Sequence, residues 1–133
     1  MKCIPGIYVN SSSMLPYADQ IIRGEKKIET RNKDMLGMFV GQRVCIIRTV
    51  QGTKTQIVGS VLISRKEYRT KAELDGMRSQ TLIPPGSKFD CYGDGKYCYY
   101  LSDPHPFRNP IPLDECKVVR KNRAYALIGD LKS

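Results

Sequence analysis

The sequence predicts a mainly β, α+β fold: an antiparallel or mixed β-barrel of about five to six short strands, flanked by two or more short helices. Three observations support this prediction. Strand-like runs outnumber helix-like ones, and the helices are too short to serve as the crossovers of a doubly wound parallel sheet. In addition, 133 residues of which 41% are apolar can fill one core. We therefore expect a single domain over residues 1–133.

The first third of the chain contains a strand, a helix and a second strand. Residues 4–9 are β-prone, and Pro16 can serve as a first helical residue because its missing N–H would be unpaired there. Residues 17–23 then predict a short helix that ends at Gly24. Residues 26–31 (KKIETR) alternate with a period of two, which indicates another strand.

The middle of the chain predicts a hairpin and a helix. Residues 40–50 and 57–64 are β-branched runs separated by a polar turn, a pattern typical of a hairpin. Residues 70–79 suit a short helix with Thr70 as N-cap and Glu73 three places on, the capping-box arrangement.

The last third returns to strands. A GDG turn at 93–95 introduces a strand dense in tyrosine. The Pro-rich segment 103–112 is interpreted as a crossing, and residues 124–129 predict the last strand.

The charge of the chain favours an anionic partner. Lys and Arg number 22 against 13 Asp and Glu, which gives a formal charge of +9. Nucleic acid is the leading candidate and an anionic membrane the next, while a solvated basic surface without a specific partner remains an alternative. No apolar stretch approaches the roughly 20 residues that span a bilayer, and no signal peptide is evident. We expect a cytoplasmic protein with no membrane partner.

The five cysteines predict neither disulfides nor a metal site. Their number is odd and no pair has the CxxC spacing, so reduced, mostly buried thiols are the simplest interpretation. Cys91, Cys98 and His105 follow one another at intervals of seven, but structural zinc requires four ligands at tight spacings. We expect no metal and no cofactor.

The most informative segment is 15–31, in which a short helix stops at Gly24 and is followed by Lys26, Glu29 and Arg31. The glycine permits a tight turn, Lys26 follows it at the mouth of the strand, and Glu29 and Arg31 share one strand face. Inside a cleft these charges would have to pair or be compensated by a ligand. The alternative is an exposed edge strand whose charges prevent aggregation.

The pattern Gly24-x-Lys26-x-x-Glu29-x-Arg31 resembles the G-x-K-x-x-E-x-R signature of the ASCH (activating signal cointegrator homology) family. Residues 100–104 and 109–112 look like the late strand and crossing that face this signature. The resemblance implies a PUA-like β-barrel beside helices, with the signature lining a cleft for RNA or a nucleotide. The expected partner is single-stranded RNA, a nucleotide or a nucleoside.

The resemblance also implies two possible activities. Some members of the family hydrolyse the amide of N4-acetylcytidine with a Lys-Thr-Glu arrangement, and others cut single-stranded RNA. In this chain Glu29 stands where the threonine would be, and Glu67 and Glu73 are the candidates for the glutamate. The catalytic candidates are therefore Lys26, which could stabilise an oxyanion or phosphate, and Glu29, which could position water.

Three further residues are candidates for binding the substrate or RNA. Arg31 could form a bidentate contact with phosphate or hold Glu29, and Tyr17 and Ser102 could each bond a base or phosphate or be structural. Lys26 is expected to meet the ligand directly, so that its loss leaves the fold intact. A hydrolase acting on RNA or a modified nucleoside, a non-catalytic RNA-binding module and a protein-binding scaffold all remain open, and the oligomeric state is not determined.

Overall fold

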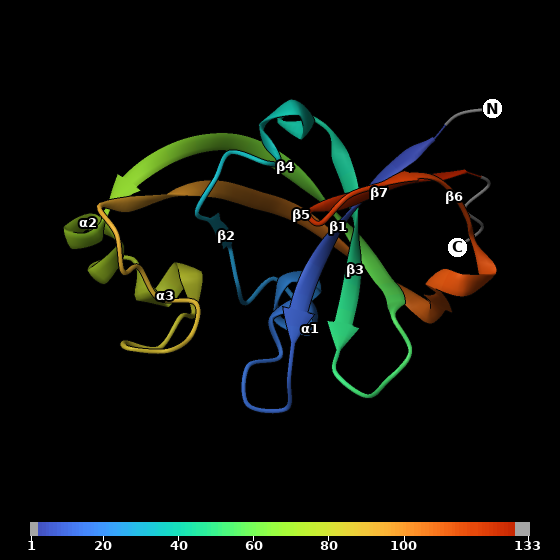
Figure 1. The fold of residues 1–133 in the computed structure, drawn as a ribbon, viewed down its shortest axis with the longest axis horizontal. Helices are drawn as coiled ribbons and strands as arrows, with labels where there is room; N and C mark the ends of the chain where they lie inside the picture. The colour runs from blue at the N-terminus through green and yellow to red at the C-terminus, as the bar shows by residue number, and fades with distance from the viewer. Residues whose placement is uncertain (1–2, 130–133) are drawn as a thin grey trace.

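Residues 3–129, which the computed structural model describes, form one mixed sheet of seven strands in the order β2-β5-β4-β3-β1-β7-β6 (Figure 1). The strands are β1 (Ile4–Ser11), β2 (Ile28–Arg31), β3 (Arg43–Val50), β4 (Gln56–Thr70), β5 (Gly95–Pro112), β6 (Lys117–Lys121) and β7 (Tyr125–Gly129). The helices are α1 (Tyr17–Ile22), α2 (Lys71–Asp75) and α3 (Arg78–Thr81), with single 3-10 turns η1 (Gly37–Phe39) and η2 (Leu113–Glu115). Strands β1 and β3 are parallel, and the other pairs are antiparallel. The mainly β, barrel-like α+β fold is thus confirmed.

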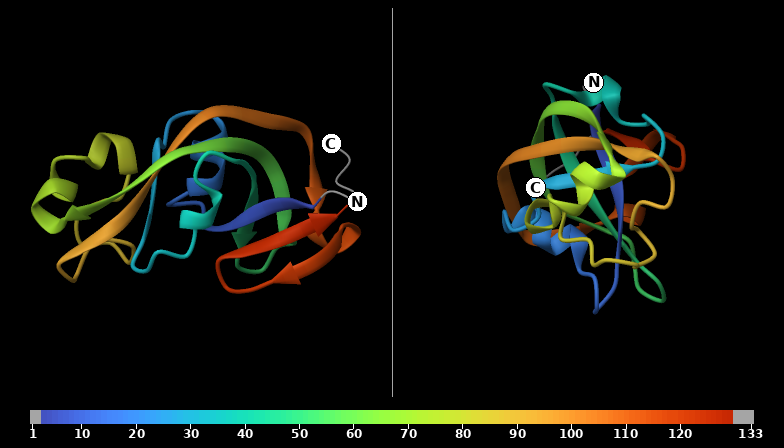
Figure 2. Two further views of the ribbon diagram at one scale, coloured as in Figure 1. Left: turned by 90° about the horizontal axis from the view of Figure 1, so that it is seen from above. Right: turned by 90° about the vertical axis from the view of Figure 1, so that its left-hand side faces the viewer.

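The sheet curls strongly, and the long ribbon of β4 and β5 connects two parts of the molecule (Figure 2). At one end of the ribbon lie α2 and α3, while β1, β3 and β7 cross it toward the other end (Figure 1). The main core lies between α1 and the curled sheet. It is filled by buried side chains of these elements, among them Ile7, Val9, Ile21, Val44, Ile46, Val58 and Ile63.

Most of the predicted elements occur where the sequence placed them. The 40–50 and 57–64 runs form the β3–β4 hairpin, and Thr70 caps α2 in a capping box with Glu73. Pro16 occupies the N-cap of α1 and not its first helical position. The helix predicted over 70–79 is interrupted at Gly76, after which the chain continues as α3.

Two segments differ from the prediction: one lengthens β5, and the other adds a seventh strand, β6. Residues 103–112 continue β5 instead of crossing between strands, because three register shifts between β4 and β5 accommodate prolines that cannot donate to a regular ladder. Gly59 allows the close approach there, since a Cβ on it would lie 2.6 Å from the carbonyl oxygen of His105. Strand β6 was not predicted, because this short edge strand is charged and mostly exposed.

Between residues 3 and 129, the structure has no helix with the length and hydropathy needed to cross a membrane. All five cysteines are free; Cys45, Cys91 and Cys98 are buried, and Cys3 and Cys116 are half-buried. The expectation of mostly buried thiols is confirmed for these three.

Candidate functional site

The turn after α1 places the charged motif. Gly24 has a φ of +79°, a left-handed conformation that glycine adopts without strain. The N–H groups of Glu25 and Lys26 both return to the carbonyl of Gln20, at 2.9 and 3.1 Å. The chain then enters β2, in which Glu29 pairs with Tyr99 of β5. This reversal brings Lys26 beside the strand that carries the other two charges of the motif.

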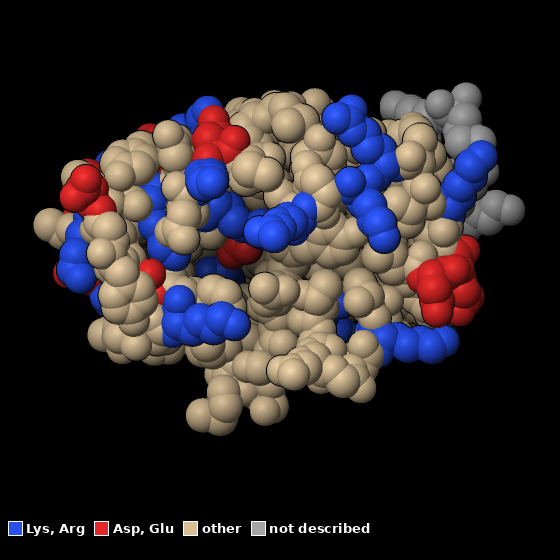
Figure 3. Space-filling model, in the orientation of Figure 1, with Lys and Arg blue, Asp and Glu red and all other residues tan. Residues whose placement is uncertain are grey.

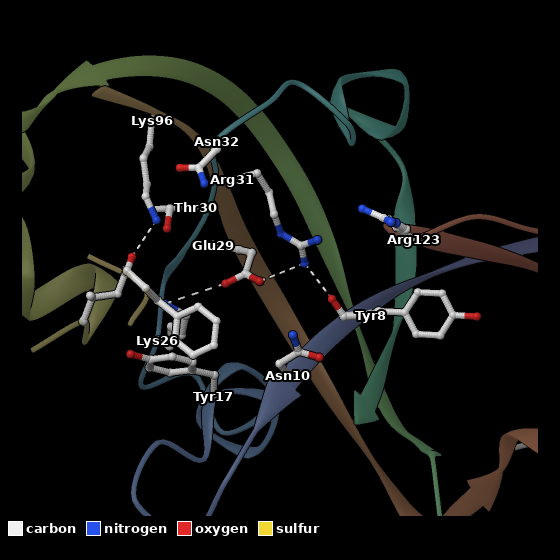
Figure 4. Close-up of a pocket in the computed structure, with 12 residues that line it drawn as sticks. Tyr8, Asn10, Tyr17, Lys26, Glu29, Thr30, Arg31, Asn32, Lys96 and Arg123 are labelled. Atoms are coloured by element: carbon white, nitrogen blue, oxygen red, sulfur yellow. Dashed lines mark hydrogen bonds and ion pairs between the residues drawn. The ribbon is translucent and has the colours of Figure 1, made fainter. Parts of the chain in front are cut away.

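A cavity of about 200 Å³ opens beside β2. On the face seen in Figure 3, Lys and Arg side chains gather around a hollow that contains acidic atoms. The cavity lies between β1 and the segment that follows α3, and Figure 4 shows the side chains around it. It is lined by Tyr8, Asn10, Tyr17, Lys26, Glu29, Thr30, Arg31, Asn32, Ile83, Phe89, Lys96 and Arg123.

Glu29 is the centre of a buried ion-pair network (Figure 4). Its side chain is 11% exposed, and its Oε2 accepts a hydrogen bond from Arg31 Nη2 at 2.9 Å. Its Oε1 lies 3.8 Å from Lys26 Nζ. The same Arg31 nitrogen donates to the carbonyl of Tyr8 at 2.6 Å, which ties β2 to β1. Strand β2 is an edge strand, but Glu29 and Arg31 line a cavity, as the cleft hypothesis predicted.

Lys26 is buried more deeply than the sequence suggested. It is 1% exposed, its Nζ donates to the carbonyl of Thr81, and it lies 4.4 Å from the centroid of the Tyr17 ring. Burial lowers the pKa of Lys26, and the neighbouring Glu29 partly offsets this effect. Loss of Lys26 would therefore leave a buried carbonyl and a buried carboxylate without this partner, contrary to the expectation that the fold does not depend on it.

Two aromatic rings form one wall of the cavity. Tyr17 and Phe89 pack edge to face, with ring centroids 5.7 Å apart and an interplanar angle of 71°. The Tyr17 hydroxyl is buried and has no hydrogen-bond partner among residues 3–129. Burial, with smaller contributions from Glu29 and Asp90, raises the pKa of Tyr17 to about 12. The phenol therefore keeps its proton at neutral pH and remains a hydrogen-bond donor.

Several lining residues were missed by the sequence reasoning. Asn10 comes from β1, Asn32 from the bend after β2, Phe89 from the segment after α3, Lys96 from β5 and Arg123 from the β6–β7 turn. Among them, only Lys96 has a sequence pattern that could have identified it as a lining residue. It follows the GDG turn much as Lys26 follows Gly24. The others come from elements far apart in the sequence.

Other predicted residues do not reach the cavity. Ser102 lies on β5, where it pairs with Leu62 of β4, and is not a lining residue. Glu67 accepts hydrogen bonds from Arg69 and from the Tyr100 hydroxyl, and Glu73 belongs to the capping box. Neither glutamate therefore supplies a second carboxylate to the cavity.

The lining residues do not form a metal site. Glu29 is the one carboxylate among them. No group of three or more His, Cys, Asp or Glu that could hold a metal ion occurs within the described range, residues 3–129.

Three solved structures of similar fold are forms of one protein, the ASCH protein of Zymomonas mobilis. The ASCH protein of Zymomonas mobilis superimposes with a TM-score of 0.67 and 18% identity, over 83% of this chain and 75% of that one. Its serine-to-alanine and tyrosine-to-phenylalanine mutants superimpose with TM-scores of 0.66 and 0.67 and identities of 20% and 18%. No protein-family model and no curated protein matches the sequence. The ASCH fold implied by the 24–31 motif is thus confirmed at the level of structure.

Proposed function

We propose, from the ASCH fold of this chain, that its cavity binds a nucleotide or nucleoside, either free or as one unit of single-stranded RNA. The observation that carries this proposal is the lining of the cavity, in which the packed rings of Tyr17 and Phe89 stand beside four cationic side chains and a single carboxylate. Its volume of about 200 Å³ admits one base or nucleoside and no duplex.

The chemistry of the lining fits the way in which proteins recognise unpaired bases. Such bases are splayed out of a strand, packed on aromatic or Arg side chains and hydrogen-bonded along their edges. Phe89 and Tyr17 offer apolar surface, and the amides of Asn10 and Asn32 offer donors and acceptors for a base edge. The formal charge of +9 would attract a polyanion from a distance.

A second candidate function is hydrolysis at the same site. The observation that favours it is the Lys26–Glu29 pair inside the cavity, where Nζ and Oε1 are 3.8 Å apart. Glu29 would orient a water and take its proton as the oxygen attacks an amide carbon or a phosphorus atom, and Lys26 would stabilise the negative charge that develops. The C–N or P–O bond to the leaving group would then break, and the leaving nitrogen or oxygen would take the proton from Glu29. The low-dielectric surroundings of Lys26 would strengthen that contact.

The free thiols suggest the compartment. Five unpaired cysteines are typical of a reducing environment, so we place this function in the cytoplasm.

One experiment tests both functions. The purified protein is incubated with a panel of modified nucleosides, nucleotides and short single-stranded RNAs, binding is measured by calorimetry, and products are identified by mass spectrometry. Retention without products supports a binding module, and products that disappear with Glu29→Gln support a hydrolase. The substitution preserves the size of the side chain. Ligand binding by the Glu29→Gln variant therefore serves as the control, because it separates a loss of hydrolysis from a loss of binding. Neither retention nor products across the panel would overturn the proposal.

A further inference from the structure

Lys96 is a second buried lysine at the cavity, and the ion-pair network around Glu29 does not include it. The residue lies at the start of β5 and is 6% exposed. Its Nζ donates to the carbonyl of Phe89 at 2.5 Å (Figure 4). An ammonium group has three N–H donors, so this hydrogen bond uses one of them. Lys96 forms no ion pair with a carboxylate of residues 3–129.

The carboxylates near Lys96 are engaged by other cations. Glu29 is held by Arg31 and Lys26. Asp90 accepts hydrogen bonds from the N–H groups of Gly86 at 2.7 Å and Cys91 at 2.8 Å, and it pairs with Arg78 at 3.3 Å. Burial lowers the pKa of Lys96, an effect that Glu29 and Asp90 oppose from a distance. The charge of Lys96 is therefore compensated incompletely within the protein.

The cavity as a whole has an excess of positive charge. Lys26, Arg31, Lys96 and Arg123 line it together with Glu29, which leaves three positive charges in excess. A buried cation without a counter-charge is costly, and natural proteins retain one mainly where a ligand compensates it. We propose that Lys96 is the specificity-determining residue of the cavity. The free N–H groups of its ammonium hold an anionic phosphate oxygen of the ligand.

The inference rests on the proposed nucleotide function and narrows it. It states that the preferred ligand carries a phosphate inside the cavity, so that a nucleotide binds much more tightly than the corresponding nucleoside. Arg31, at the same cavity, is suited to a second phosphate oxygen, because a guanidinium presents several donors in one plane. Both a terminal phosphate of a free nucleotide and an internal phosphodiester of RNA offer this chemistry.

The test uses a matched pair of lysines. Lys96→Gln removes the charge but retains an N–H donor for the Phe89 carbonyl. Lys71→Gln is the control, because Lys71 also donates to a carbonyl of this segment, that of Cys91 at 3.3 Å, yet it is exposed and outside the cavity. Binding is measured by calorimetry for four nucleosides, their 5′-monophosphates, dinucleoside monophosphates without terminal phosphates, and inorganic phosphate.

We expect wild type and Lys71→Gln to bind at least one phosphorylated ligand about tenfold or more tightly than its nucleoside, the gain typical of a charged hydrogen bond. In Lys96→Gln this preference should fall by about tenfold, with any remainder due to Arg31, while nucleoside affinity changes by less than about twofold. Tighter binding of the monophosphates identifies a terminal phosphate, and tighter binding of the dinucleoside monophosphates identifies a phosphodiester.

Other outcomes separate this inference from the proposed function. Equal affinity of wild type for nucleosides and phosphorylated ligands would overturn the role of Lys96 and leave the nucleotide site standing. If Lys96→Gln lost the same factor of affinity for nucleosides and for nucleotides, the role of Lys96 would also be overturned. Such a result would show that the lysine supports the segment around Phe89. Lys96-dependent binding of inorganic phosphate without any nucleotide binding would sustain the phosphate contact and refute the nucleotide function.

Discussion

At the scale of single residues, the position of Lys26 decides what the cavity can do. Its ammonium contacts a backbone carbonyl, a carboxylate and an aromatic face at once, so it is both a structural group and a lining group. A residue of this kind cannot be replaced without a cost in stability, and its contribution to function has to be separated from that cost.

Lys26→Ala should lower the free energy of unfolding by about 1 to 3 kcal/mol, because it leaves the Thr81 carbonyl without its donor and Glu29 with one cation fewer. It should also weaken ligand binding or turnover by about tenfold to a hundredfold. Denaturant unfolding and calorimetry measure the two effects. Lys27→Ala is the control, since Lys27 is exposed and its side chain bonds only the Gly24 carbonyl among the described residues, while its backbone hydrogen bonds survive the substitution. Wild-type stability together with wild-type binding in the Lys26 variant would contradict this role.

Tyr17→Phe removes a buried hydroxyl that has no protein partner between residues 3 and 129. We expect the free energy of unfolding to change by less than about 0.5 kcal/mol or to rise, because no hydrogen bond between protein groups is lost. The ring and its edge-to-face contact with Phe89 remain. Chemical denaturation of the variant measures this. A loss above about 1 kcal/mol would show that the hydroxyl makes a stabilising contact.

At the scale of elements, the turn between α1 and β2 sets the geometry of the site. Gly24 ends the helix with a positive φ, and the following N–H groups bond back to Gln20. The strand that follows is only four residues long, so its register against β5 determines which side chains enter the cavity. A one-residue slip would turn Glu29 and Arg31 to the opposite face of the sheet.

Gly24→Ala should lower the free energy of unfolding by about 1 kcal/mol because of its left-handed backbone. Space is not the reason, since the nearest atom to an added Cβ would be Pro104 Cγ at 3.6 Å. Gly24→Asn should cost less, because asparagine adopts this conformation more readily than alanine. Thermal unfolding of the two variants measures the difference. If alanine were tolerated better than asparagine, the turn would not depend on the positive φ.

At the scale of the whole molecule, the charge distribution sets how a polyanion would approach. The formal charge is +9, and Lys and Arg side chains gather around the hollow in Figure 3. Binding of single-stranded RNA should therefore release counterions from the phosphates that the protein neutralises.

Raising the salt concentration from about 50 to 200 mM should weaken binding of single-stranded RNA by at least about tenfold, if two or three phosphates are neutralised. Fluorescence anisotropy across a salt series measures the slope of affinity against salt. A nucleoside should bind with almost the same affinity over this range, because it carries no phosphate. An RNA affinity that stays flat would indicate that the cavity takes up a base without any backbone contact.

The sequence by itself determined the features that depend on neighbouring residues. The period-two pattern of residues 26–31, the capping box of Thr70 and Glu73 and the β3–β4 hairpin are local, so propensity and spacing predict them. The ASCH-like motif also predicted that Glu29 and Arg31 would lie in a cleft. The pattern-based predictions succeed because the physical interactions that produce these elements span only a few residues along the chain. The cleft was expected from the resemblance and not from local spacing.

Only the tertiary structure decided the composition of the site. Lys26 is held by Thr81, which is 55 residues further along the chain, and Lys96 by the carbonyl of Phe89. Ser102 pairs within the sheet instead of lining the cavity, and the Pro-rich segment after it pairs with β4. The physical reason is that the cavity forms where several elements distant in sequence meet. Which side chains become buried there depends on how the sheet curls, a property that no local pattern encodes.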